Sequence, residues 1–448
     1  MERRNFIANL AMGGGLFWAA PFFANDFSQT DGKRIPLTAS DTISADLIIA
    51  GGGLGGCAAA LAALRNGLTV IMTEETDWIG GQLTQQGVPP DEHPWIESHG
   101  ATALYRTLRN GIRAYYRNNY PLRQEVAADP HFNPGGALVS RLAHEPKVAL
   151  AVLEGFFAPY ISSRKLLLLK KYKAVSADTR GNRVLGLHVK SLRTGTTKHL
   201  KGPYFVDATE LGDLLPMTGT EYITGAESKK QTGELHAADK YEPNNNQAFT
   251  HCFAIDYVKG GDWTIKKPEE YTFWKDFVPD LRPSWPGKLL ELNYSNPRTL
   301  KPKALGFHPE GLAMENILNL WNYRRIIDST NFKPGFYHSD ITIVNYPQND
   351  YFLGNIVDVG PAEIDLHIHR GKQLSLSLLY WLQTEAPRPD GGKGWRGLRL
   401  RGDIMGTENG DGLAKYPYIR ESRRIKALFT VQEQHVGKEQ RSKITGVT

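Results

Sequence analysis

The sequence predicts an α/β protein with a parallel sheet, an inserted β-meander and a second lobe that mixes helices and strands. The first observation is residues 46–75, where an apolar strand, a glycine-rich turn, an alanine-rich helix and a second apolar strand follow one another. Strand–helix–strand alternation of this kind favours a parallel sheet. The second observation is a set of strand-like segments between residues 165 and 209, separated by turn residues. The third is residues 216–400, which are irregular and rich in aromatic side chains.

The composition is that of a globular protein, since 41% of the 448 residues are hydrophobic and 22% are charged. The formal net charge is only +6, and no run of Lys and Arg is interleaved with aromatic residues, which argues against a nucleic-acid partner. No apolar segment reaches the roughly 18 residues of a stable membrane span. The two cysteines, Cys57 and Cys252, predict neither a disulfide framework nor a structural zinc site, and no metal site is expected.

The N-terminus has the features of an export signal. Arg3 and Arg4 precede roughly 14 mostly apolar residues, and small residues follow near Ala24. This arrangement resembles a twin-arginine signal, which exports proteins that are already folded; a general secretory signal and an ordinary tail are the alternatives. We therefore expect an export signal at residues 1–24, a linker at 25–44, and a periplasmic or extracellular protein.

Regular elements are predicted from the spacing of apolar residues. Helical spacing recurs over residues 101–118, 144–162 and 371–385. The stretches "KLLLLKKYKAVSAD", "NRVLGLHVKSL" and "TTKHLKGPYFVDAT" predict the three strands of the meander. The elements group into a first domain, a second lobe that would hold a substrate, and a final segment that returns toward the first domain. These parts are expected at residues 45–215, 216–405 and 406–448.

The glycine-rich turn fits the pattern G-x-G-x-x-G, with a strand before it and a helix after it. Gly51 permits the tight turn, Gly53 lets the backbone approach a pyrophosphate, and Gly56 lets the helix pack closely on the strand. The start of the helix, at Leu54 and Gly55, offers unpaired N–H groups and the positive end of the helix dipole to phosphates. The residues therefore predict dinucleotide binding; a glycine-rich turn in an unrelated βαβ unit is the alternative.

Two further features identify the expected dinucleotide as FAD rather than NAD. Glu74 ends the second strand, where an acidic residue accepts hydrogen bonds from ribose hydroxyls. It is followed by "TDWIGGQLTQQG", in which Gly80, Gly81 and Gln82 would lie against a large cofactor.

The second feature is the end of the meander. In flavoproteins that resemble glutathione reductase, a strand ending in Ala-Thr returns to the nucleotide-binding domain, and Ala208 and Thr209 would form that return here. Asp207, Glu210 and Asp213 lie beside it, either as part of the site or as ordinary turn and helix-cap carboxylates.

Longer stretches resemble the FAD-dependent oxidoreductase family, bacterial and often secreted flavoproteins with the glutathione-reductase type of Rossmann-like fold. They cover most of residues 45–440 and include "TDWIGGQLTQQGVPPDEHPWIE", "SRLAHEP", "VDATELGDLLPMTGTEYITGAES", "VNYPQNDYF" and "RESRRI". The resemblance implies non-covalent FAD, a two-lobed fold and redox chemistry at the flavin ring. It also implies a further glycine- and alanine-rich segment over the flavin, which this sequence lacks before Thr448. We therefore expect residues 406–448 to be truncated and to retain the flavin weakly.

The expected reaction is hydride transfer between a small organic substrate and flavin N5. Oxidation of a CH–OH or CH–NH group, with a carbohydrate-related substrate, is the leading hypothesis. A C=C reductase fed by a periplasmic donor and a non-catalytic ligand-binding protein are the alternatives. The sequence has neither a second nucleotide-binding turn nor a C-x-x-C pair, so electrons would pass to or from an external acceptor or donor.

Candidate catalytic residues are few. His93 lies in "PPDEHPW", His144 lies in "SRLAHEP", and Arg141 precedes His144 as a possible carboxylate clamp. The alternatives are a loop-packing histidine for His93 and a helix-capping or salt-bridged pair for Arg141 and Glu145.

Two other motifs have a structural alternative. In "DLHIHRG" we expect His367 and His369 to share one face of a solvated strand, with a metal pair as the less favoured interpretation. The arginines of "RESRRI", residues 420–425, would bind either an anionic group of FAD or substrate, or neighbouring surface carboxylates.

Overall fold

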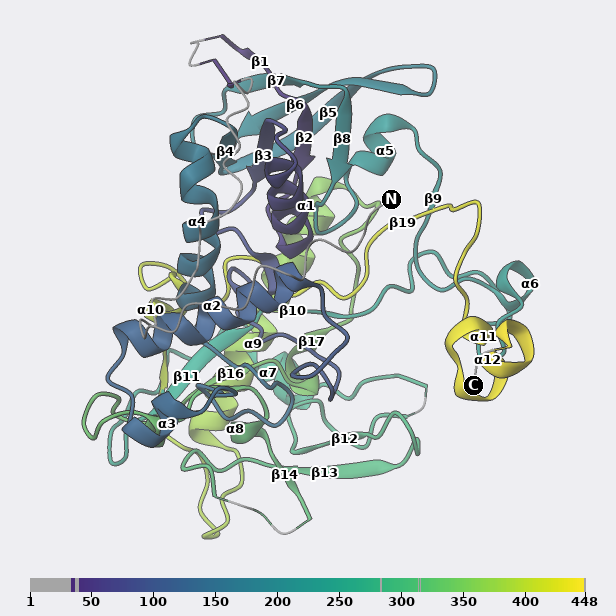
Figure 1. Ribbon diagram of the computed structural model, residues 1–448. Helices are drawn as coiled ribbons and strands as arrows, with labels where there is room; N and C mark the ends of the chain where they lie inside the picture. Colours follow the sequence, from purple (N-terminus) through teal and green to yellow (C-terminus); the bar gives the residue numbers. More distant parts are fainter. Residues whose placement is uncertain (1–33, 37–39, 283, 313, 315, 447–448) are drawn as a thin grey trace. The chain divides into compact units, whose positions relative to one another are not determined.

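The computed structural model describes residues 34–36, 40–282, 284–312, 314 and 316–446 (Figure 1). The export signal expected at residues 1–24 lies outside them. Residues 33–448 belong to one unit.

A four-stranded parallel sheet forms the frame of the first domain, in the order β4-β3-β2-β8. Its strands are β2 (Leu47–Ala50), β3 (Val70–Glu74), β4 (Leu166–Lys170) and β8 (Tyr204–Asp207). Helix α1 (Leu54–Arg65) connects β2 to β3 and packs on both strands (Figure 1). The central strands β2 and β3 are largely buried on both faces, and Ile48, Ile49, Ile71 and Met72 are fully buried. The predicted α/β class with a parallel sheet is thus confirmed.

The β-meander contains three strands as predicted, but two of the three predicted stretches each divide between two sheets. The antiparallel strands β5 (Tyr172–Arg180), β6 (Arg183–Ser191) and β7 (Thr197–Lys201) form the meander. The first stretch breaks at Lys171, which has a φ of 60°, and its apolar half becomes β4. The third breaks at residues 202–203, where Pro203 has no N–H to donate, and its second half becomes β8. A strand from the expected linker, β1 (Thr42–Ser44), adds parallel to β7.

The helices expected at residues 101–118 and 144–162 are present as α2 (Ala103–Asn119) and α4 (Pro146–Ser162). Thr102 caps α2 by accepting a hydrogen bond from the N–H of Tyr105 at 3.2 Å. The two helices pack against each other, and α4 also contacts α1 and β4.

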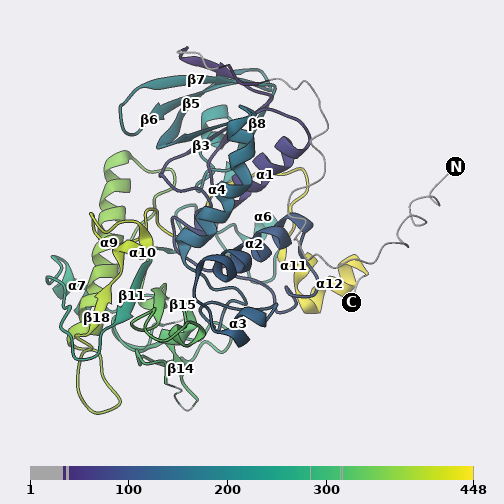
Figure 2. The same cartoon turned by 60° about the vertical axis from the view of Figure 1, so that its left-hand side comes forward.

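The second lobe contains a four-stranded antiparallel sheet in the order β15-β16-β11-β18. Its strands are β11 (Phe253–Tyr257), β15 (Arg325–Ile327), β16 (Ile341–Val344) and β18 (Leu398–Leu400). The long helix α9 (Pro361–Thr384) packs on the short strands β10 (Phe249–Thr250) and β17 (Asp350–Tyr351) of this lobe, and its length is clear in Figure 2.

The prediction of a strand around His367 and His369 is wrong, because both residues lie within α9. The helix begins ten residues earlier than expected, with Pro361 in its first turn, where a proline is well tolerated. In a helix, residues two apart do not share a face, so these histidines cannot form the pair that a strand would give. His367 instead accepts or donates a hydrogen bond at Nδ1 with the hydroxyl of Tyr351, at 2.7 Å.

Shorter elements complete the described chain. They are η1 (Gly81–Leu83), α3 (Gln124–Ala128), α5 (Leu214–Thr218), β9 (Tyr222–Ile223), α6 (Lys229–Thr232), β10 (Phe249–Thr250), α7 (Tyr271–Asp276), β12 (Asn293–Ser295), β13 (Pro302–Gly306), β14 (Leu318–Asn319), α8 (Leu320–Tyr323), η2 (Ser329–Asn331), η3 (Pro347–Asn349), β17 (Asp350–Tyr351), α10 (Gly402–Met405), β19 (Arg424–Ile425), α11 (Glu433–Val436) and α12 (Lys438–Thr445).

One hydrophobic core joins the first domain to the second lobe. It contains Ile49 and Met72 from the parallel sheet together with Ile341 and Ile343 from β16 and Met405 from α10. A second core holds most of the aromatic side chains of the second lobe, including Trp274, Trp321, Trp381 and Trp395. Most of the lobe's aromatic residues therefore serve packing.

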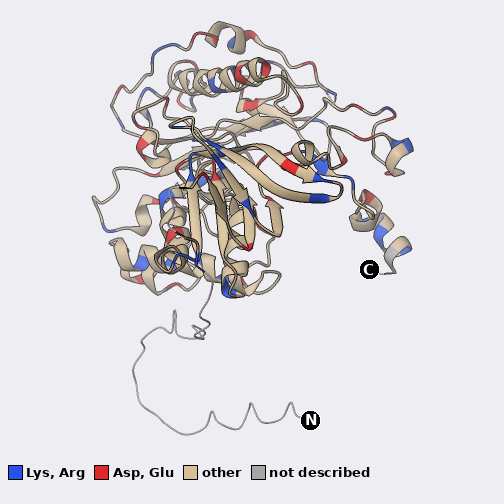
Figure 3. Cartoon of the chain, turned by 90° about the horizontal axis from the view of Figure 1, so that it is seen from above, with Lys and Arg blue, Asp and Glu red and all other residues tan. Residues whose placement is uncertain are grey.

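The distribution of the charged residues and the state of the two cysteines are those expected from the composition. Lys and Arg are interspersed with Asp and Glu over the described chain (Figure 3). Within the described ranges, every helix is too short or too polar to cross a bilayer. Both Cys57 and Cys252 are free and buried.

Candidate functional site

The glycine-rich turn lies between the end of β2 and the start of α1. Gly51 has a φ of +99°, and a Cβ on it would lie 2.1 Å from the carbonyl oxygen of Ala208. The N–H of Ala208 also donates to the carbonyl of Ala50 at 2.8 Å, so β2 and the end of β8 are in direct backbone contact. A Cβ on Gly56 would lie 2.2 Å from the carbonyl oxygen of Gly51. Both positions therefore require glycine, one for conformation and one for the packing of the helix on the strand.

The start of α1 presents free backbone donors. Gly53 is the N-cap residue, and the first hydrogen bond of the helix runs from the N–H of Cys57 to the carbonyl of Gly53, at 2.9 Å. The N–H groups of Leu54, Gly55 and Gly56 come before it and point out of the helix end. No atom lies within 4 Å of the position that a Cβ on Gly55 would take. An anion can therefore approach these donors, as a pyrophosphate site requires.

Glu74 holds the turn from the end of β3. Its carboxylate is buried and accepts hydrogen bonds from the N–H of Gly52 at 3.1 Å and from the N–H of Thr76 at 2.7 Å. Burial raises the pKa of Glu74 from 4.5 to about 7. Each carboxylate oxygen can accept more than one hydrogen bond, so the predicted contacts with a ribose remain open to it.

The glycine pair Gly80–Gly81 packs on the glycine turn at Gly51–Gly53. Gly80 and Gly81 have φ angles of +109° and +55°, and the N–H of Gly80 donates to the carbonyl of Gly52 at 2.8 Å. A Cβ on Gly81 would lie 3.1 Å from the Cα of Gly53. The adjacent Gln82 points to the next loop and donates to the carbonyl of Pro89 at 3.2 Å. The glycines at 51–53 and 80–81 thus leave backbone without side chains on both sides of the turn.

The carboxylates beyond β8 have different surroundings. Asp207 accepts hydrogen bonds from the N–H groups of Thr209 and Leu214, which is the structural role of a turn and helix cap. Asp213 forms an ion pair with Arg423 at 3.0 Å. Glu210 instead lies over the glycine turn.

The carboxyl group of Glu210 occupies the place at the start of α1 that a bound anion would take. One of its carboxylate oxygens would be 3.1 Å from a Cβ on Gly53 and 3.2 Å from a Cβ on Gly81. Burial raises the pKa of Glu210, which favours the neutral carboxyl group. A pyrophosphate bound at the same helix end would meet this side chain and require it to be protonated or turned away.

Tyr416 closes the site from the C-terminal part of the chain. It lines the same pocket as the glycine turn, Glu74 and Glu210, and its N–H donates to the carbonyl of Gln85 at 3.4 Å. Burial and the neighbouring carboxylates raise the pKa of its hydroxyl. The free volume of the pocket is about 20 Å³, enough for about one water molecule. The turn and its donors fit a dinucleotide, but the segment carrying Tyr416 must move to admit one.

None of the predicted catalytic residues lines this pocket. His93 lies in a loop, where its Nε2 is 3.3 Å from the carbonyl of Gly100. His144 is buried, and burial lowers its pKa to about 4, so it is neutral and a weak base at neutral pH. Arg141 is exposed. The structure therefore does not bring these three residues to the glycine turn.

A buried cluster that the sequence did not reveal surrounds Glu145. Its carboxylate accepts hydrogen bonds from the hydroxyls of Tyr116, Tyr120 and Tyr337, at 3.2, 2.8 and 3.1 Å. The expected salt bridge with Arg141 is thus replaced by three tyrosines. No local pattern could have shown this, because Tyr337 lies 192 residues from Glu145.

A polar cavity of about 580 Å³ adjoins the Glu145 cluster. This volume lies within the usual range for a small-molecule site, about 300–1,000 Å³. Its lining residues are Tyr115, Asn119, Tyr120, Phe336, Tyr337, His338, Arg399 and Arg401.

The arginines of "RESRRI" bind protein carboxylates. Arg420 pairs with Asp350 at 2.8 Å, and Arg423 pairs with both Asp213 and Asp358. Arg424 pairs with Glu421 and Glu227. This segment therefore connects the C-terminal part of the chain to both lobes through ion pairs.

The strand–turn–helix unit, the acidic end of β3 and the inserted meander define a flavoprotein of the dinucleotide-binding class. The chain belongs to the FAD dependent oxidoreductase family, whose model matches residues 46–446. This confirms the resemblance seen in the sequence, the cofactor FAD and the enzyme class.

Solved structures similar to part of this chain include the following three. L-proline dehydrogenase from P. horikoshii is 15% identical, with a TM-score of 0.20, over 42% of this chain and 24% of its own. THI4 from Thermovibrio ammonificans is 18% identical, with a TM-score of 0.25, over 41% and 67% of the two chains. The 3-ketosteroid-delta4-(5alpha)-dehydrogenase from Rhodococcus jostii RHA1 is 13% identical, with a TM-score of 0.23, over 48% and 56%. The comparison with curated proteins gave no match.

Proposed function

We propose that this protein binds FAD at the glycine turn and oxidises a CH–OH or CH–NH group of a small organic substrate, with carbohydrate-related compounds as the first class to test. The observation that supports this most strongly is the backbone geometry at Gly51 and Gly56, where any larger residue would collide with the chain. Bound FAD supplies the acceptor for a hydride from the substrate. The N–H groups of Leu54, Gly55 and Gly56 would hold the pyrophosphate, and Glu74 would hold the ribose.

The protein's own residues would position the cofactor rather than supply a strong base. His144 is neutral, and the described carboxylates nearest the turn, Glu74 and Glu210, have raised pKa values. A carboxylate whose pKa is near 7 can hold or release a proton at neutral pH. Electrons would leave to an external acceptor. The twin-arginine signal supports export to the periplasm or beyond.

The first experiment is the visible absorption spectrum of the purified protein, before and after heat denaturation, with the released nucleotide identified as FAD. Flavin bands that are shifted in the protein and released on heating are the expected result. Sugars, hydroxy acids and amino acids are then tested without oxygen for bleaching of the flavin. A spectrum without flavin, unchanged by added FAD, would contradict the proposal.

Two alternatives predict different results in the same assay. A C=C reductase would be bleached only by an added electron donor and reoxidised by an unsaturated substrate. A ligand-binding protein of this fold would show neither change, and Tyr416 in the cofactor pocket favours this alternative more than any other feature. Bleaching by a substrate alone supports the oxidase or dehydrogenase reaction.

A further inference from the structure

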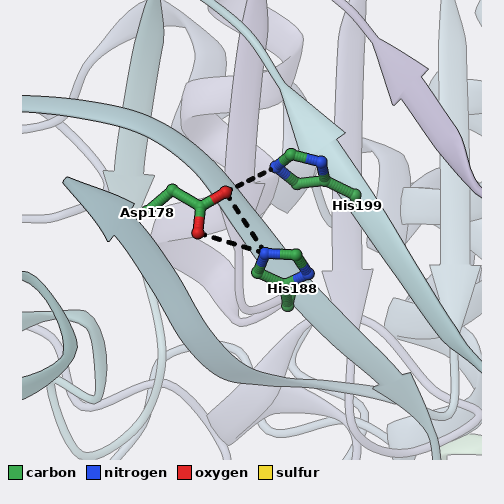
Figure 4. A group of neighbouring side chains, drawn as sticks. All are labelled: Asp178, His188 and His199. Carbon is green, nitrogen blue, oxygen red and sulfur yellow. Dashed lines mark hydrogen bonds and ion pairs between the residues drawn. The ribbon is translucent and has the colours of Figure 1, made fainter.

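Three side chains with metal-binding atoms meet on the β-meander. They are Asp178 from β5, His188 from β6 and His199 from β7 (Figure 4). The Nε2 atoms of His188 and His199 lie 3.2 and 3.0 Å from the same carboxylate oxygen of Asp178. One ligand atom from each residue lies within 4.8 Å of the other two.

The strand register brings these residues together. His188 and His199 are directly opposite each other in the antiparallel pair of β6 and β7, and their rings stack with centroids 4.4 Å apart. Asp178 is opposite Gly186, two residues before His188, so its side chain lies on the same face. The neighbouring positions Leu187 and Leu200 are buried in the core on the other face. The cluster therefore lies on the outer, solvent-facing side of the meander.

Gly186 makes the space for the ring of His199. A Cβ on Gly186 would lie 2.2 Å from the Nε2 of His199. Glycine inside a strand usually weakens it, and often marks a place where another group must approach closely. Here the group that approaches is the His199 ring, turned so that its Nε2 faces Asp178.

The contact of His199 with Asp178 is close but poorly directed for a hydrogen bond. In the described part of the chain, the Nε2 of His199 forms an ion pair with the Asp178 carboxylate at 3.0 Å, at an angle that makes no regular hydrogen bond. Ligands around a tetrahedral zinc ion, at about 2.0–2.2 Å from the metal, are about 3.3–3.6 Å from one another. The distances of 3.0 and 3.2 Å between the nitrogens and the carboxylate oxygen are slightly shorter, so a small opening of the cluster would admit the ion.

We propose that Asp178, His188 and His199 form a binding site for a divalent transition-metal ion, with Zn²⁺ as the ion to test first. Two imidazoles and one carboxylate suit Zn²⁺, Cu²⁺ or Ni²⁺ rather than Mg²⁺ or Ca²⁺, which prefer oxygen ligands. The side chains of Asp178 and His188 are 47% and 33% exposed, so water can complete the coordination. The ion would connect three adjacent strands of the meander.

This site is independent of the proposed FAD site. Its three residues do not line the pocket at the glycine turn, which β5 reaches only at its other end, through Tyr172, Lys173 and Ala174. A failure to bind FAD would therefore say nothing about the metal site. FAD binding and metal binding are measured separately.

The test is equilibrium dialysis of the full chain against Zn²⁺, together with the visible spectrum after loading with Co²⁺. The wild-type protein should bind one ion at this site and give the intense Co²⁺ bands of a tetrahedral centre. His188→Asn, His199→Asn and Asp178→Asn should each lose this spectrum and weaken binding by more than about 10-fold. His236→Asn is the matched control, because His236 also contacts a carboxylate, Glu433 at 2.5 Å, but belongs to no three-ligand group among the described residues.

Gly186→Ala tests the geometry without removing a ligand. The added methyl group should push the His199 ring away and weaken Zn²⁺ binding by about 10–100-fold, the range seen when a supporting residue is changed. Circular dichroism shows whether each variant is folded. If the wild-type protein binds Zn²⁺ no more tightly than the folded His188→Asn variant, or if His236→Asn loses as much affinity, the proposal is wrong and the cluster is a surface ion pair only.

Discussion

The carboxylate of Glu74 accepts a hydrogen bond from the backbone N–H of Gly52, so the last residue of β3 fixes the turn that follows β2. This contact joins the two sequence features on which the dinucleotide prediction depends, the glycines and the acidic residue. It also places a carboxylate in a buried position, which has a measurable consequence for stability.

The buried Glu74 should make the protein less stable as the pH rises. Its pKa is raised from 4.5 to about 7, so between these values the folded state binds a proton that the unfolded state has lost. The free energy of unfolding therefore falls from pH 4.5 to pH 7, by about 3 kcal/mol from this residue. Glu74→Gln, which cannot ionise, should lack this part of the pH dependence. Urea unfolding of both proteins without cofactor measures the difference; parallel pH profiles would contradict the assigned pKa.

Gly51→Ala should be severely destabilising, because the new Cβ would lie 2.1 Å from the carbonyl oxygen of Ala208 at a φ of +99°. We expect a loss of about 3 kcal/mol or more and no FAD binding. Gly55→Ala is the matched control, since no atom lies within 4 Å of its Cβ position. It should be as stable as the wild-type protein. Thermal unfolding distinguishes the two variants. Equal melting temperatures would show that Gly51 does not lie against Ala208 as described.

Tyr416→Ala should bind FAD more tightly than the wild-type protein. The tyrosine fills space beside the glycine turn, so its removal raises the fraction of molecules open to the cofactor. If that fraction rises from about one tenth to nearly one, the apparent Kd falls about tenfold. Flavin fluorescence titration measures it. Tyr418→Ala is the control, because Tyr418 lies in the same segment but does not line the pocket. Weaker FAD binding by Tyr416→Ala would mean that the ring supports the cofactor.

Glu145→Ala should destabilise the protein by about 2–4 kcal/mol, because three tyrosine hydroxyls lose their buried acceptor. Glu145→Gln keeps an acceptor oxygen and should lose less. The exposed Glu125 provides the control, since its replacement by alanine should change stability by no more than about 0.5 kcal/mol. The measurement is the urea midpoint at constant m value; an equal effect of both alanine variants would show that the tyrosine cluster contributes nothing.

The parts of the site that could be predicted from the sequence are those determined by neighbours along the chain. Gly51, Gly56 and Glu74 belong to one strand–helix–strand unit, and their roles follow from backbone geometry within it. Glu210 was expected beside the return at Ala208 and Thr209, but its place over the glycine turn was not predicted, and Tyr416 was not predicted at all, because it reaches the turn from a distant part of the chain. Nothing in their local sequence indicates that contact.

The errors in secondary structure have local causes. The apolar run at residues 166–169 continues into the meander without a glycine or proline, so the break at Lys171 was not visible. Around His367, a short alternation of polar and apolar residues matched a strand, whereas the helix that contains it extends over 24 residues. Short alternating patterns cannot distinguish the two, and the length of the surrounding element decides.

The hydrophobic core shared by the parallel sheet and the second lobe limits how this protein can be rebuilt. Met72 and Ile343 pack within one continuous core, although one lies in the parallel sheet and the other in the antiparallel sheet of the second lobe. A chimera that exchanged the second lobe for that of a relative would leave part of this interior without its partner side chains. Single substitutions, such as those around the cavity near Tyr337, leave this core in place, whereas the transfer of whole modules does not.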